Sequence, residues 1–141
     1  MKPGISLLFS AVALAGCASV PVRPEVASVT LVPVSSASIE VHRPRFKIKD
    51  GDLKLEAYAL RQWTAHTTAD THIDLVYLDA TGKQLAIEST NFSPRSLPKT
   101  TRLPAPHGYL LASVKLPAGT RAIEVRAHDG VHDAIYINPA R

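Results

Sequence analysis

Cysteine is nearly absent from this chain, because Cys17 is the only one among 141 residues. A single cysteine excludes a disulfide framework and a zinc centre built from several cysteine ligands. Aromatic residues are also scarce, and no basic platform interleaved with aromatic side chains, as single-stranded nucleic acid requires, is visible. A domain built from such a chain must be stabilised by burial of an apolar core.

The common signatures of catalysis are missing as well. The chain contains no Gly-x-Ser-x-Gly, no glycine-rich phosphate loop, no His-Glu-x-x-His and no carboxylate pair at a recognisable spacing. We therefore expect a protein that is not an enzyme, and we predict no catalytic residues. An envelope enzyme whose acid or nucleophile residues converge only in space is a third hypothesis.

The N-terminus contains one short apolar segment. Lys2 supplies a positive charge, and residues 5–15 are apolar apart from two serines. This length suits a secretion signal, whereas a bilayer span takes about 20 apolar residues. The segment therefore predicts export and not a transmembrane helix.

The tetrapeptide Leu14-Ala15-Gly16-Cys17 closes this segment and resembles the lipobox of bacterial lipoproteins. The resemblance implies removal of residues 1–16, attachment of diacylglycerol to the Cys17 sulfur and acylation of the freed amine. Ala18 stands where lipoproteins retained in the inner membrane often have Asp, so the resemblance favours the outer membrane, with the domain facing the periplasm. With Cys17 acylated, no thiol remains for a nucleophile.

The mature chain divides into two parts. Residues 17–26 include Pro21 and Pro24 and show little periodicity, which indicates a lipidated, extended tether. Residues 27–141 have the length of one domain.

Within 27–141, the hydrophobic pattern is that of successive β-strands. Apolar and polar residues alternate at 53–59 and 123–127, while 73–78 is apolar on both faces apart from Asp74. The turn 79–82 makes 72–90 the clearest hairpin, and the turn 117–120 predicts 123–127 as the return strand of 109–116. Further strands are expected near 29–31, 39–41 and 134–137.

Seven or eight short strands, with no helical periodicity after the signal segment, predict an all-β fold, an antiparallel β-sandwich. In general pattern it resembles immunoglobulin-like and fibronectin-III-like modules, and a small β-barrel is the alternative. Trp63 does not extend that resemblance, because the immunoglobulin tryptophan packs on a disulfide that this chain cannot form. We expect Trp63 to pack in or against the core, with an exposed ligand-stacking role as the alternative.

Positive charge is concentrated between Ser89 and Ile123, where there are five Lys or Arg residues and no acidic residue. Arg95, Lys99 and Arg102 lie in the proline-rich segment 91–108, which is long for a loop in a compact domain. We predict that this basic loop contacts an anionic glycolipid, an anionic envelope polymer or an acidic envelope protein. A merely solvated loop is the alternative, and nucleic acid is not expected as a partner.

Histidines form a second concentration. Around Gly130 the sequence places two histidines and two aspartates, namely His128, Asp129, His132 and Asp133. Imidazole suits Zn²⁺ and Cu²⁺, but this spacing is not a strong metal signature and Asp-Gly is a common turn. We therefore predict no cofactor, with a copper or zinc site as the alternative. His66 and His72, which bracket Asp70, form a weaker candidate pair.

Together these observations predict a lipid-anchored lipoprotein of the cell envelope, a non-catalytic binding or scaffold module that uses the loop 91–108. The membrane is its partner through the N-terminal lipid. The alternative is a periplasmic transition-metal-binding lipoprotein that uses the His128/His132 cluster.

Overall fold

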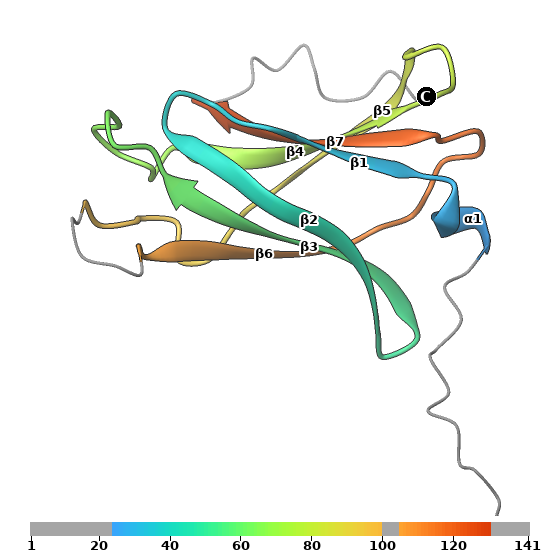
Figure 1. Cartoon of the computed structure of the whole chain (residues 1–141), viewed down its shortest axis with the longest axis horizontal. Coiled ribbons are helices and arrows are strands. Elements are labelled where there is room, and N and C mark those ends of the chain that lie inside the picture. Colours follow the sequence, from blue (N-terminus) through green and yellow to red (C-terminus); the bar gives the residue numbers. More distant parts are fainter. Residues whose placement is uncertain (1–23, 100–104, 131–141) are drawn as a thin grey trace, which may run out of the picture.

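The computed structural model describes residues 24–99 and 105–130, and these form seven strands after one short helical turn (Figure 1). In the described part of the chain, no helix is long and apolar enough to cross a membrane. The elements are α1 (Pro24–Ala27), β1 (Thr30–Val34), β2 (Ile39–Lys49), β3 (Asp52–Arg61), β4 (Thr71–Leu78), β5 (Gln84–Thr90), β6 (His107–Ser113) and β7 (Ala122–Asp129).

The strands lie in two sheets, one above the other in Figure 1. The four-stranded sheet has the order β1-β7-β4-β5, and the three-stranded sheet has the order β2-β3-β6. Two separate sheets confirm the predicted all-β sandwich, and not the small barrel that was the alternative. The fold is therefore a scaffold whose loops gather at two opposite ends.

The core lies between the inner faces of the two sheets. Strand β3 contributes the predicted alternating set, whose Leu55, Ala57 and Ala59 are almost fully buried. Opposite them, β4 and β7 contribute Ile73, Leu75, Tyr77, Ile123, Val125 and Ala127. A fully buried Leu or Ile side chain stabilises such a fold by about 1.5–3 kcal/mol.

The predicted hairpin at 72–90 is confirmed as the antiparallel pair β4 and β5. The Asp79 carboxylate accepts hydrogen bonds from the backbone N–H groups of Thr81 and Lys83, and Gly82 has a φ of 82°. These bonds close an Asx-type turn, for which Asp and Gly are the favoured residues. The local sequence therefore specified this turn.

The strand 123–127 was expected to return beside 109–116, and this pairing is wrong. Strand β6 pairs with β3 in one sheet, whereas β7 pairs with β4 in the other. The connection 114–121 crosses between the sheets, which pack about 10 Å apart in sandwiches of this kind. Strand β7 also pairs in parallel with β1, so the sandwich is not wholly antiparallel.

The fold also begins earlier in the chain than expected, because the extended tether was predicted to reach residue 26. Pro24–Ala27 forms the helical turn α1, and Val26 is buried in the core cluster. Several features predicted from the sequence lie outside the described residues, namely the signal segment 1–16, Cys17, Arg102, His132, Asp133 and the strand expected at 134–137.

The two ends of the sandwich carry different segments (Figure 1). At one end, the α1 end, lie α1, the β4–β5 turn and the connection 114–121. At the opposite end, which we call the far end, lie the loops that follow β3 and β5. The described part of the basic loop therefore lies across the molecule from the point where the chain enters the fold.

Candidate functional site

Arg61, the last residue of β3, joins the two loops of the far end. Its Nη1 donates to the carbonyl oxygen of Leu97 at 2.6 Å, and its Nη2 donates to the carbonyl oxygens of Ala65 and His66 at 2.7 and 2.8 Å. One guanidinium therefore ties the loop after β3 to the loop after β5.

Thr68 makes a second tie between the same loops. Its buried hydroxyl donates to the carbonyl oxygen of Arg95 at 2.8 Å and accepts from the backbone N–H of Leu97 at 2.9 Å. The Leu97 side chain is fully buried in the core. The described part of the basic loop is therefore fixed to the scaffold, because both its backbone and one apolar side chain are anchored.

Trp63 lies at the far end, in the loop after β3, and 62% of its area is exposed. The expectation that Trp63 packs in or against the core is therefore wrong. Strand β3 ends at Arg61, so the alternation that buries its side chains does not extend to Trp63, which lies in the following turn. The Lys99 ammonium is 5.2 Å from the centroid of the indole ring, which is the arrangement of a cation–π contact.

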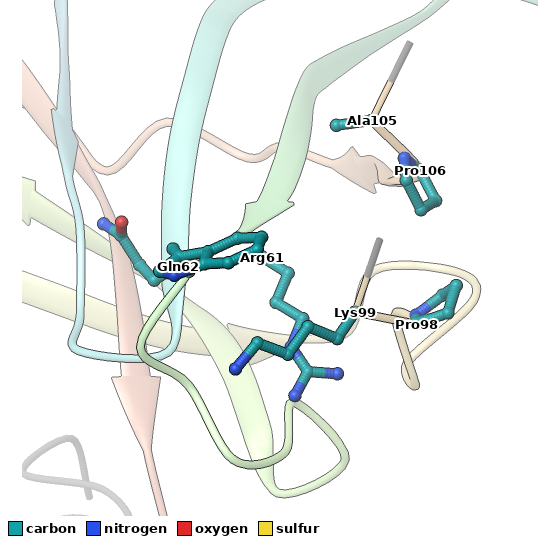
Figure 2. Close-up of a pocket in the computed structure, with 7 residues that line it drawn as sticks. Arg61, Gln62, Pro98, Lys99, Ala105 and Pro106 are labelled. Carbon is teal, nitrogen blue, oxygen red and sulfur yellow. The ribbon is translucent and has the colours of Figure 1, made fainter. Parts of the chain in front are cut away.

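A small hollow lies beside this contact (Figure 2). Figure 2 shows Arg61, the last residue of β3, near Lys99 from the loop after β5; Gln62 and Pro98 lie on opposite sides of the view. The lining residues are Arg61, Gln62, Trp63, Pro98, Lys99, Ala105 and Pro106. The hollow thus combines cationic and apolar walls.

The two loops of the far end carry the exposed cations Arg95 and Lys99, together with one exposed carboxylate, Asp70. Among the described residues, no carboxylate forms an ion pair with Arg61, Arg95 or Lys99. Arg61 Nε is in addition buried without a hydrogen-bond partner in the described part of the chain. The exposed cations Arg95 and Lys99 can attract an anion to this surface.

The four described basic residues between Ser89 and Ile123 do not form one patch. Arg95 and Lys99 lie at the far end, whereas Lys115 and Arg121 line a hollow at the α1 end. Strand β6 separates the two groups, because it runs the length of the sandwich between them.

Among the described residues, two histidines that are far apart in the sequence lie side by side. His128 lies in β7 directly opposite His72 in β4, and their ring centroids are 5.0 Å apart. Asp74 lies two residues along β4 from His72 and is almost fully buried. His66 is exposed in the loop after β3, so the pair His66 and His72 is not the pair that shares a site.

Asp129 forms hydrogen bonds to two other elements of the fold. Its carboxylate accepts from the hydroxyls of Ser36 and Thr71 at 2.9 and 2.8 Å, and from the backbone N–H of Ser38 at 3.2 Å. Burial alone would raise the pKa of Asp129, but the bonds from Thr71, Ser36 and Ser38 outweigh it and lower that pKa. Asp129 thus joins β7 to β4 and to the connection before β2.

Sequence reasoning missed a third polar arrangement on the outer face of the three-stranded sheet. There Glu56 is 2% exposed, accepts from the Tyr109 hydroxyl at 2.6 Å and pairs with Arg45 and Lys47. The bond from Tyr109 is the largest cause of a lowered Glu56 pKa, and burial opposes it. The alternation correctly placed Glu56 on the outer face, but it gave no signal that neighbouring side chains cover it.

Comparisons with protein-family models, with curated proteins and with solved structures found no match. Function is therefore inferred from the chemistry of these surfaces.

Proposed function

We propose that the protein is a lipid-anchored, non-catalytic binding module of the cell envelope, held to the outer membrane through Cys17, whose far end binds an anionic, sugar-containing polymer. The observation that carries this proposal is the exposed Trp63 ring beside Lys99, on a surface that Arg61 and Thr68 hold in place.

This combination of groups suits an anionic sugar. The flat indole offers a large apolar face at a small cost in conformational entropy, and sugar rings have apolar C–H faces of similar width. Lys99 and Arg95 are exposed and supply positive charge for phosphate or carboxylate groups. Because Arg61 and Thr68 already fix the described parts of both loops, binding there would order few additional groups.

The position of the far end favours a polymer over the head groups of the anchoring leaflet. Residues 17–23 span about 25 Å at most when fully extended. A strand of eight residues, such as β4, spans about 26 Å. An anchor attached at the α1 end would thus hold Lys115 and Arg121 nearest the lipid surface and direct Trp63 and Lys99 away from it.

Co-sedimentation with purified cell-wall sacculi tests this function, with lipopolysaccharide aggregates as a second anionic probe. The full-length lipidated protein in detergent should sediment with the sacculi at low salt and be released at high salt, since surface charges are screened within a few ångströms at 1 M. Trp63→Ala and Lys99→Glu should each weaken retention about tenfold, as expected for residues central to an interface.

Lys83→Glu is the matched control, because it reverses one exposed charge in the turn at the α1 end. Reversal of Arg95, Lys99 and Arg102 together should abolish retention. Equal retention of the wild type, Trp63→Ala and Lys99→Glu would exclude the far end as the binding surface. Retention on lipopolysaccharide alone would point to a glycolipid as the ligand.

A further inference from the structure

We propose that His72, Asp74 and His128 form a binding site for a divalent transition-metal ion on the outer face of the four-stranded sheet. This site differs from the cluster of neighbouring residues suggested by the sequence, and it shares no residue with the surface around Trp63 and Lys99. Only His128 is common to both ligand sets.

The distances already approach those of a metal site. His72 Nε2 lies 3.4 Å from Asp74 Oδ1, and His128 Nδ1 lies 3.8 Å from Asp74 Oδ2. One ligand atom from each of the three residues lies within 4.8 Å of the others. Bonds of about 2.0–2.2 Å to a tetrahedral Zn²⁺ place neighbouring ligand atoms about 3.3–3.6 Å apart. Small side-chain rotations would therefore bring all three groups onto one ion.

The backbone positions of the three ligands are fixed by strand pairing. His72 and His128 are directly opposed in the ladder between β4 and β7, the two central strands of the sheet. Asp74 follows two residues later on β4, and period two puts it on the same face as His72. Ligands on paired central strands are held more firmly than ligands on a loop, which favours a preorganised site.

The surroundings of Asp74 suit a metal-binding carboxylate. The Ser89 hydroxyl donates to Asp74 Oδ1 at 2.7 Å and so fixes the orientation of the carboxylate, as outer-shell partners of metal ligands do. Arg126, directly opposite Asp74 in the ladder, is paired with Glu124 on the same face. That arginine charge is thus partly neutralised by Glu124 near the place where the cation would bind.

The donor set indicates the class of ion. Two imidazoles and one carboxylate suit Zn²⁺ and Cu²⁺ better than Mg²⁺ or Ca²⁺, which prefer oxygen ligands alone. His128 is 38% exposed, whereas His72 and Asp74 are largely covered, so an ion would enter from the side of His128. Three protein ligands leave a fourth position for water or another donor.

Isothermal titration of the full-length, tag-free protein in detergent with Zn²⁺ at pH 7.5, where imidazole is mostly neutral, tests the site. We expect one Zn²⁺ per chain at micromolar affinity or tighter. His72→Ala, His128→Ala and Asp74→Asn should each weaken binding at least about tenfold. Zn²⁺ should raise the unfolding temperature of the wild type but not of these variants.

His66→Ala is the matched control, because it removes an exposed loop histidine and should leave the affinity unchanged. Circular dichroism checks that each variant is folded. Asp74→Asn keeps an oxygen that can accept from Ser89, and His128 is partly exposed, so these two variants decide the outcome if His72→Ala does not fold. Absence of saturable heat from the wild type, or wild-type affinity in both deciding variants, would overturn the proposal.

Discussion

Replacing Glu56 by Gln removes the negative charge from the buried polar group on the outer face of the three-stranded sheet. The structure allows the cost to be worked out contact by contact. A hydrogen bond to a charged group contributes about 1.5–3 kcal/mol, against about 0.5–1.5 kcal/mol for a neutral one, and a Gln oxygen could still accept from Tyr109. The change from a charged to a neutral acceptor therefore costs about 1–1.5 kcal/mol.

The two cations add little to this figure. Arg45 is 63% exposed and Lys47 is 51% exposed, so each stays hydrated when the carboxylate is removed. Exposed ion pairs of this kind contribute about 0.2–1 kcal/mol at most. We therefore expect Glu56→Gln to lower the free energy of unfolding by about 1–2 kcal/mol at pH 7.

The same substitution should change the pH dependence of stability. The pKa of Glu56 is lower in the folded protein than its ordinary value, mainly because Tyr109 donates to the carboxylate. The stabilisation is therefore fully present above the unfolded pKa of about 4.3 and is lost as pH falls through the folded pKa. The difference between wild type and variant should shrink steadily below about pH 4.

Urea unfolding followed by circular dichroism measures this difference, on a form that lacks residues 1–16 and carries Cys17→Ser. Glu40→Gln is the control, because Glu40 lies on the neighbouring strand of the same sheet and is half exposed. Its effect should stay within about 0.5 kcal/mol. A difference for Glu56→Gln that stays the same from pH 7 to pH 3 would refute the proposed role of the carboxylate.

Two further predictions concern the anchor and the core. Cys17→Ser should abolish incorporation of labelled fatty acid into the protein, because the Cys17 sulfur and the amine freed before it are the expected acylation sites. Labelling of the variant at the wild-type level would contradict lipid anchoring through Cys17. Gly108→Ala should destabilise the fold by about 1–3 kcal/mol, because its Cβ would lie 2.4 Å from a ring carbon of the buried Phe92. Urea unfolding measures the loss of stability. Adding Phe92→Leu to the Gly108→Ala variant should recover part of that loss. A Gly108→Ala variant as stable as the wild type would contradict the expected clash with the Phe92 ring.

Features that depend on neighbouring residues in the chain could be predicted from the sequence. The period-two alternation of 53–59 specified which side chains of β3 face the core, since successive side chains of a strand point to opposite faces. Asp79 and Gly82 specified the β4–β5 turn through a local side-chain bond and a positive φ. Asp74, the one charged residue in the apolar strand 73–78, and the two singled-out histidines His72 and His128 were local signals of the cluster on the outer face of the four-stranded sheet, but nothing local indicated that the three lie together.

Features that depend on which strands become neighbours were decided by the tertiary structure. The order of the strands places β6 and β7 in different sheets and brings His72 opposite His128, which are far apart in sequence. The same packing covers Glu56 with Tyr109, while the end of β3 leaves Trp63 exposed. The physical reason is that hydrophobic periodicity fixes the inward face of each strand, whereas its partner and register depend on the packing of the whole sandwich.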